Sequence, residues 1–317
     1  MNTAATAFLF PGQGSQAVGM GKDLFERFPG ARKTFDEADQ ALGKKLSKLC
    51  FDGPEDQLRL TENTQPAILT VSVAAWRVLE EKGIRPGFVA GHSLGEYSAH
   101  VAAGTISFAD AVRTVRNRGK YMQEAVPVGT GAMAAILGMT LDAVGAVCGD
   151  AAQGEVCEPA NINSPEQIVI SGHAAAVERA VKLAQDRGAK RAILLPVSAP
   201  FHCSLMKPAQ ERLAVDLQKL EFAAPKIPVV CNVYAKLVED AESSREALVR
   251  QVTGSVKWSE SVQLLIARGI QTFVEVGPGK VLCGLMRQID RSKKCVNVED
   301  EPSLQKTMEN VESSASA

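Results

Sequence analysis

The sequence predicts an α/β protein with a parallel main sheet, into which a second, smaller α/β segment is inserted. Two observations support this class. In residues 1–128, and again after Pro200, short apolar strand candidates alternate with helical stretches, a pattern typical of a parallel sheet covered by helices. Between these regions the candidate elements follow the order β-α-β-β-α-β, which indicates a separate small sheet.

The first region contains the strand candidates that would hold a ligand. Apolar runs at 7–10 and 88–90 each end in a loop that carries glycine. In open parallel sheets, ligands bind beyond the carboxyl ends of the strands. The stretch 64–83 is apolar around most of its circumference until Arg77, which predicts a helix buried inside a large domain.

Residues 129–198 form the predicted insert, a split βαβ or ferredoxin-like motif. Strands are expected at 132–137, 155–161, 167–172 and 190–197, and helices at 140–148 and 174–187. Strand patterns return at 228–232 and 272–279, with an amphipathic helix between them. We therefore expect a discontinuous main domain, residues 1–128 and 199–317, with a cleft between it and the inserted domain.

The charge balance excludes some classes of partner. The chain of 317 residues has 35 Lys and Arg against 36 Asp and Glu, so its net charge is −1. This balance argues against broad electrostatic capture of nucleic acid or of an anionic membrane. The apolar run near the N-terminus is too short for a signal peptide or a membrane span.

The cysteines and histidines do not form a recognisable framework. The seven cysteines are scattered and contain no C-x-x-C, so we expect reduced thiols in a cytoplasmic protein rather than disulfides. The four histidines lack the spacing of a zinc site, so no metal is expected. The last segment, "NVESSASA", predicts a disordered end.

Ser93 lies in "GHSLG", residues 91–95, which fits the G-x-S-x-G pattern of a nucleophile elbow. A strand candidate precedes it and a helical stretch follows. The glycines remove side chains that would clash in so sharp a turn, and the turn exposes the serine hydroxyl. It also leaves the Leu94 N–H at the start of a helix, where it can face a developing oxyanion.

A nucleophilic serine needs a base, and elimination points to His202. His92 adjoins Ser93 and should point away from it, whereas His100 lies two turns into the following helix. His173 starts a helix of the insert, where a capping or surface role is expected. No acid stands out as a third member of a triad, but a backbone carbonyl can hold a histidine tautomer equally well.

Two further features narrow the chemistry. Arg118 falls at the edge of the apolar stripe of the helix at 109–123, where it is either a structural salt bridge or a bidentate clamp for a substrate carboxylate. The loop "FPGQGSQ", residues 10–16, would supply a second oxyanion donor. It lacks the lysine and the spacing of a phosphate loop.

Seven motifs occur in order along almost the whole chain: "FPGQGSQ", "TQPA", "GHSLGE", "RG" with "MQEA", "NINSPEQIVISG", "SAPFH" and "EVGPGKVL". Together they closely resemble the malonyl-CoA:acyl-carrier-protein transacylases of bacterial fatty-acid synthesis. The resemblance implies an α/β-hydrolase-like large domain with a parallel sheet, interrupted by a small ferredoxin-like subdomain. It also implies malonyl transfer from malonyl-CoA to the phosphopantetheine thiol of acyl carrier protein through a malonyl-serine intermediate, without cofactor or metal.

The resemblance assigns roles to positions of this sequence. The nucleophile falls on Ser93 and the histidine on His202, and the oxyanion donors are the N–H groups of Gln13 and Leu94. The malonate-binding arginine falls on Arg118.

The remaining assignments concern the histidine and the cleft. A segment that resembles "GSVKW" places the carbonyl that orients the histidine at Lys257, which stands where the family is associated with glutamine. Gln65 and Gln167 match polar residues that line the cleft and are expected to bind substrate.

Three alternatives stay open at this stage. An acyltransferase with another acyl preference would keep every catalytic residue. A thioesterase or serine hydrolase would share the elbow but would pass its acyl group to water. A non-catalytic protein that docks a carrier is disfavoured because the reactive positions are intact.

Overall fold

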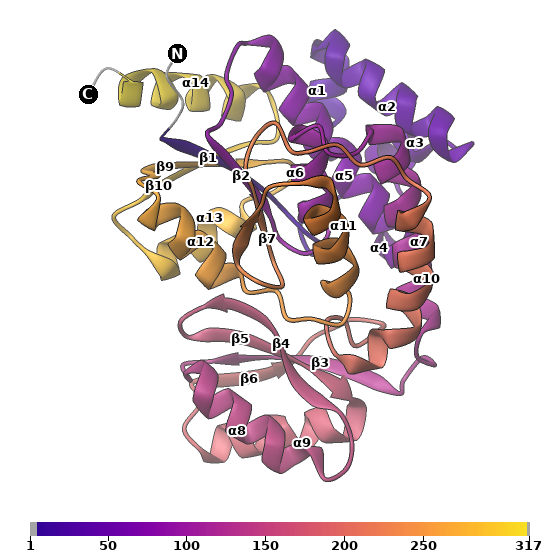
Figure 1. Cartoon of the computed structure of the whole chain (residues 1–317), viewed down its shortest axis with the longest axis vertical. Helices are drawn as coiled ribbons and strands as arrows, with labels where there is room; N and C mark the ends of the chain where they lie inside the picture. The colour runs from indigo at the N-terminus through magenta and orange to yellow at the C-terminus, as the bar shows by residue number, and fades with distance from the viewer. Residues whose placement is uncertain (1–4, 316–317) are drawn as a thin grey trace.

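The computed structural model describes residues 5–315 and shows a mixed α/β protein with two sheets (Figure 1). The larger sheet has six strands in the order β10-β9-β1-β2-β7-β8, and the smaller has four in the order β4-β5-β3-β6. The predicted α/β class is confirmed.

Parallel pairing dominates the larger sheet, as the alternating pattern predicts. Five strands run parallel, and β8 pairs antiparallel with β7 at one edge. All five residues of the central strand β1 are buried, because helices cover both faces of the sheet. The strands are β1 Thr6–Phe10, β2 Phe88–Gly91, β7 Val229–Cys231, β8 Lys236–Val238, β9 Thr272–Val276 and β10 Lys294–Val298.

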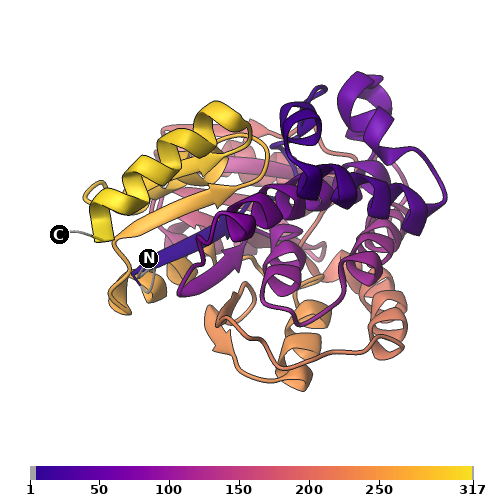
Figure 2. The same ribbon diagram turned by 90° about the horizontal axis from the view of Figure 1, so that it is seen from above.

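Helices from both ends of the chain surround this sheet. The N-terminal set is α1 Lys22–Arg27, α2 Pro29–Leu42, α3 Leu46–Asp52, α4 Glu55–Arg59, α5 Thr61–Glu81, α6 Gly95–Ala102 and α7 Phe108–Glu124. The later set is the short helix Ser204–Met206, α10 Lys207–Gln218, α11 Ala241–Arg250, α12 Trp258–Ala267, α13 Val281–Ile289 and α14 Glu301–Ala315. Helix α14 packs beside β10 (Figure 2), and it continues to Ala315, so the prediction of a disordered end is wrong for residues 310–315.

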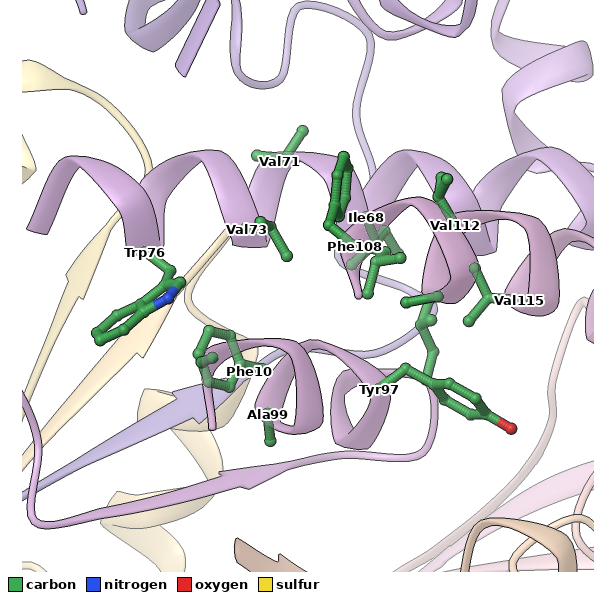
Figure 3. Close-up of a cluster of buried hydrophobic side chains, with 14 of the residues drawn as sticks. Phe10, Ile68, Val71, Val73, Trp76, Tyr97, Ala99, Phe108, Val112 and Val115 are labelled. Atoms are coloured by element: carbon green, nitrogen blue, oxygen red, sulfur yellow. The ribbon is translucent and has the colours of Figure 1, made fainter. Parts of the chain in front are cut away.

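Helix α5 forms the centre of the core, as its apolar circumference predicts. It is buried from its first turn to Leu79, apart from a half-buried Glu62 and a half-buried Arg77. Figure 3 shows side chains of α5 meeting those of β1, α6 and α7, namely Phe10, Ile68, Val71, Val73, Trp76, Tyr97, Ala99, Phe108, Val112 and Val115. This packing fixes which side of α7 faces inward.

The smaller sheet is antiparallel and carries its helices on one face (Figure 1). Its elements are β3 Gly131–Leu137, α8 Leu141–Ala152, β4 Cys157–Ser164, β5 Gln167–His173, α9 Ala174–Asp186 and β6 Arg191–Leu194. Alternate residues of β3 face opposite ways: Ala134 and Ile136 pack against the helices, and Met133 packs on the other face with Phe201 nearby. Domain boundaries at 128/129 and 198/199 remain a prediction; they fall in the loops before β3 and after β6.

The prediction that the cysteines are all reduced is wrong at one pair. Cys283 of α13 and Cys295 of β10 form a disulfide, with 5.3 Å between their Cα atoms. Their spacing in sequence gives no hint of this. The two cysteines come together only because α13, which connects β9 to β10, packs against the sheet. The five other cysteines are buried free thiols.

Among the side chains of residues 5–310, no group of three or more histidine, cysteine or acidic residues is arranged to hold a metal ion. Within residues 5–315, no helix has the length and apolar character needed to cross a membrane.

The crossing between β1, β2 and α6 requires glycine. A Cβ on Gly95 would collide with the Phe10 carbonyl oxygen, and one on Gly91 would collide with the backbone of Gly95. We predict that Gly95→Ala lowers the free energy of unfolding by about 1–3 kcal/mol. The new methyl group would press on main-chain atoms of β1, which cannot move aside as a flexible side chain can. Urea denaturation measures this change.

A matched control lies in α8, where a Cβ on Gly145 would meet nothing within 4 Å. Gly145→Ala should leave stability unchanged or raise it by up to about 1 kcal/mol, since alanine favours a helix interior. Equal stability of Gly95→Ala and Gly145→Ala would contradict the close contact between the Gly95 backbone and β1.

Candidate active site

A cavity of about 130 Å³ lies beyond the carboxyl ends of β1 and β2. These strands are parallel neighbours, so the loops that follow them meet at one edge of the sheet. The main part of the chain contributes the lining residues Gln13, Gln65, His92, Ser93, Leu94, Arg118, Met122, Phe201 and His202. The region of the smaller sheet contributes Met133, Asn161, Leu195 and Val197, so the cavity lies between the two parts, where a cleft was expected.

Ser93 occupies a strained turn directly after β2. Its φ of 51° lies in the left-handed region, which residues other than glycine adopt rarely. The Asn232 side chain braces the turn: its Oδ1 accepts the Ser93 N–H at 2.7 Å, and its Nδ2 donates to the Gly91 carbonyl at 2.7 Å. The serine hydroxyl is thereby held at the cavity.

His202 is the histidine that contacts Ser93, as elimination predicted. Its Nε2 lies 2.7 Å from Ser93 Oγ, and its Nδ1 lies 2.9 Å from the Gln251 carbonyl oxygen. Because a carbonyl can only accept, Nδ1 must carry the proton. Nε2 is then the acceptor for the serine hydroxyl, which is the arrangement of a general base.

The carbonyl that orients His202 belongs to Gln251, so the assignment of this role to Lys257 is wrong. The Lys257 carbonyl instead accepts hydrogen bonds from the N–H and the hydroxyl of Ser261 in the first turn of α12. The Lys257 carbonyl is therefore used within helix α12 and not by His202. The partner of His202 Nδ1 is thus a backbone carbonyl and not an acid, as the sequence led us to expect.

Burial keeps His202 uncharged. The side chain is 4% exposed, and desolvation together with the positive charge of Arg118 lowers the pKa of His202 to about 3. A neutral imidazole can accept a proton, so the histidine is ready to act as a base.

Arg118 lies deeper than the edge position that its helix pattern predicts. It is 2% exposed, and its guanidinium donates from Nη1 to Gln65 Oε1 at 2.7 Å. Nη2 donates to Gln251 Oε1 at 2.8 Å and to Ser93 Oγ at 3.1 Å. No carboxylate in residues 5–310 lies within ion-pair distance of it, which removes the alternative of a structural salt bridge.

The predicted oxyanion donors lie at the cavity. In the described chain, no acceptor takes a hydrogen bond from the main-chain N–H of Gln13 or of Leu94. The Gln13 side chain accepts from Thr61 Oγ1 at 2.9 Å, which anchors the glycine-rich loop to α5. Both N–H groups are therefore available to an oxygen atom that enters the cavity.

The two glutamines expected to bind substrate differ in position. Gln65 lines the cavity and holds Arg118, as described above. Gln167 does not line the cavity: it begins β5, opposite Leu137 and Ser164 in the smaller sheet. Its place in the ladder, beside a short turn, keeps it from the cleft.

The other three histidines occupy sites away from the Ser93 hydroxyl. His92 Nε2 lies 2.8 Å from Asn163 Oδ1 of β4, and its ring packs near Trp258. His100 is fully buried, and burial lowers its pKa to about 3. His173 Nδ1 accepts the Val156 N–H at 2.9 Å.

Three residues of the site were missed from sequence. Asn232 follows β7, the strand next to β2, so its place at the carboxyl edge could have been found from the strand pattern. Gln251 acts partly through its backbone, and nothing in its sequence surroundings marks it. Glu96 was part of a recognised motif but received no role.

The chain is similar to acyl transferases along almost its whole length. The model of the acyl transferase domain matches residues 7–314. The malonyl CoA-acyl carrier protein transacylase of Salmonella typhimurium is 54% identical over 284 residues, which is 89% of this chain and 92% of that protein.

Solved structures show the same likeness. The acyl carrier protein S-malonyltransferase of Vibrio cholerae superposes with a TM-score of 0.94 at 50% identity, over 96% of this chain and 99% of that one. A malonyl-transacylase in complex with AntF, a holo acyl-carrier protein of a type II PKS, also gives 0.94, at 49% identity and with the same two coverages. On this evidence the chain belongs to the malonyl CoA-acyl carrier protein transacylase family of acyl transferases.

Proposed function

We propose that this protein transfers the malonyl group of malonyl-CoA to the phosphopantetheine thiol of an acyl carrier protein, through a malonyl ester on Ser93. The observation that carries this function is the position of Arg118. This buried cation has no carboxylate partner among residues 5–310, and it lies 3.1 Å from the hydroxyl expected to be acylated. Malonate differs from acetate by one carboxylate, and such a cation would bind it in bidentate fashion.

The first half-reaction uses the hydrogen bonds already present. Ser93 Oγ attacks the thioester carbonyl carbon as its proton moves to His202 Nε2. The N–H groups of Gln13 and Leu94 stabilise the tetrahedral oxyanion. The carbon–sulfur bond then breaks, and His202 returns its proton to the departing sulfur of coenzyme A.

The second half-reaction reverses these roles. The carrier thiol gives its proton to His202 Nε2 and attacks the ester carbonyl on Ser93. The ester bond breaks, and the proton passes from His202 to Ser93 Oγ. Since the thioester is already activated, the scheme uses no cofactor or metal. The neighbouring structure of a malonyl-transacylase with its carrier protein supports a carrier as the second substrate.

The proposal includes the two-domain division and a cytoplasmic location. Residues 1–128 and 199–317 would form the catalytic domain and 129–198 the inserted one. The separate apolar cluster of the smaller sheet, which includes Ile136, Val147 and Val177, supports this division. The five free thiols support the location, whereas the Cys283–Cys295 disulfide is a feature that is rare in cytoplasmic proteins.

Acyl selectivity tests the function most sharply. Losing a charge-assisted pair in a desolvated site costs about 2–5 kcal/mol, so Arg118→Ala should lower kcat/KM for malonyl-CoA by roughly thirty- to several thousandfold. Transfer of the uncharged acetyl group should be unchanged or improved. Acyl-enzyme formation is followed by intact mass, with Ser93→Ala as the variant that forms no adduct.

The control for this variant is Arg113→Ala, on the exposed side of the same helix, where the arginine pairs with Asp110. It should leave both acyl groups unaffected. A parallel fall of malonyl and acetyl transfer in Arg118→Ala would show that the arginine only maintains the fold. Acyl-enzyme that passes rapidly to water would favour the hydrolase alternative.

The pH profile tests the state of His202. Its pKa lies far below the ordinary histidine value of about 6.5, so the base form persists as the pH falls through that value. At saturating malonyl-CoA, the first-turnover release of coenzyme A should stay level from pH 8 to about pH 6. Removing the positive charge of Arg118 should raise the pKa of His202. The release rate of Arg118→Ala, measured with acetyl-CoA, should therefore begin to fall at a higher pH than the rate of the unmodified protein. Half-loss near pH 6.5 in the unmodified protein would contradict the assignment.

A further inference from the structure

Glu96 is a fully buried carboxylate directly behind the site, in the first turn of α6. Its Oε2 accepts two hydrogen bonds, from Gln251 Nε2 at 2.7 Å and from the Asn232 N–H at 3.0 Å. Its Oε1 has no hydrogen-bond partner among the described residues, and His100 Nε2 lies 4.0 Å away. A buried carboxylate is costly, so its presence at this position needs a reason.

The Gln251 amide connects this carboxylate to Arg118. Its Nε2 donates to Glu96 and also to the Ser93 carbonyl at 3.0 Å, and its Oε1 accepts from Arg118 Nη2 at 2.8 Å. Turning the amide over would direct its oxygen at two acceptors and its hydrogens at the guanidinium. Glu96, together with the Ser93 carbonyl, therefore fixes the orientation in which Gln251 can hold Arg118 beside Ser93.

Glu96 also balances the charge of the arginine at a distance. Burial raises the pKa of Glu96 to about 7, while the bonds from Gln251 and Asn232 and the charge of Arg118 act to lower it. The negative charge of Glu96 in turn acts to raise the pKa of Arg118, against the effect of burial. The neighbouring His100 and His202 are neutral, because burial lowers both of their pKa values to about 3.

The indirect contact has a consequence for substrate. A carboxylate paired directly with Arg118 would occupy the guanidinium and exclude an acyl carboxylate. A carboxylate one amide further away leaves the guanidinium open, but it still repels any anion that binds there.

We propose that Glu96 is a positioning residue that sets how tightly the site holds the acyl carboxylate. It holds Arg118 beside Ser93 through Gln251, and its negative charge weakens the grip of Arg118 on the malonyl group. The bound acyl group can then leave when the second thiol attacks. This inference rests on the proposed malonyl transfer and assigns a residue that controls its substrate affinity.

Glu96→Gln separates charge from hydrogen bonding. The new amide oxygen can accept from both Gln251 and Asn232, so the connection to Arg118 is kept while the negative charge is lost. The inhibition constant of free malonate against malonyl-CoA should fall roughly three- to tenfold, the size expected for one charge several ångströms away. The KM for acetyl-CoA should not change. The assay is run above pH 8, where Glu96 is ionised in the unmodified protein.

Gln251→Ala is the second variant, and it should act in the opposite direction. It keeps the main-chain carbonyl that His202 uses but removes the amide that holds Arg118. The malonate inhibition constant should rise several-fold, with a smaller effect on acetyl-CoA. This variant also serves if Glu96→Gln does not fold: an unchanged inhibition constant in Gln251→Ala then overturns the proposal.

The matched control is Glu275→Gln. Glu275 is the other fully buried glutamate among residues 5–310, and burial raises its pKa to about 7 as well. Its oxygens, however, accept the N–H groups of Leu282 and Cys283 in α13. Neutralising it should leave malonate binding unchanged. An equal effect of Glu275→Gln and Glu96→Gln would show a general loss of stability rather than a local charge effect, and it would overturn the proposal.

The outcomes distinguish a failure of the role of Glu96 from a failure of the proposed malonyl transfer. If the unmodified protein forms no malonyl adduct on Ser93, the proposed function fails. If the adduct forms normally but Glu96→Gln binds malonate as before, or changes malonate and acetyl-CoA alike, only the role of Glu96 fails.

Discussion

A buried guanidinium, beside which the described part of the chain places no carboxylate, dominates the electrostatics around Ser93. Removing the charge of Arg118 from water is costly unless oxygen atoms face it, and the chain supplies amide oxygens from Gln65 and Gln251 in place of an ion pair. Neutral amides satisfy the donors without cancelling the charge. The cavity therefore favours an anion that enters from outside, and the same charge helps to keep His202 neutral.

Two close contacts in the fold bring this charge to the serine: the packing of α7 on α5, and the crossing of the elbow over β1. Packing of α7 on the central helix α5 turns the inner face of α7 toward the cavity, so Arg118 points inward with the apolar side chains of its stripe. The elbow after β2 crosses β1 so closely that Gly91 and Gly95 have no room for a Cβ. Asn232, which directly follows β7, fixes the strained Ser93 backbone from the other side.

The sequence predicted those residues whose role follows from local pattern. Ser93 stands between a strand and a helix in a glycine turn, and Arg118 interrupts a helical stripe, so neither required knowledge of the tertiary structure. Gln251 was missed because its backbone carbonyl orients the histidine, and any residue presents a carbonyl. Gln167 was misplaced because a polar residue at the start of a strand can face either the cleft or the outer end of a sheet. The Cys283–Cys295 pair depends on a crossover that spacing cannot reveal.

The most direct test of this account is a crystal structure of the protein after reaction with malonyl-CoA, in which the acyl group is visible. The account predicts an ester on Ser93 Oγ, with its terminal carboxylate paired to the Arg118 guanidinium and its carbonyl oxygen facing the N–H groups of Gln13 and Leu94. A malonyl group on another residue would contradict it. So would an ester on Ser93 whose carboxylate lies away from Arg118.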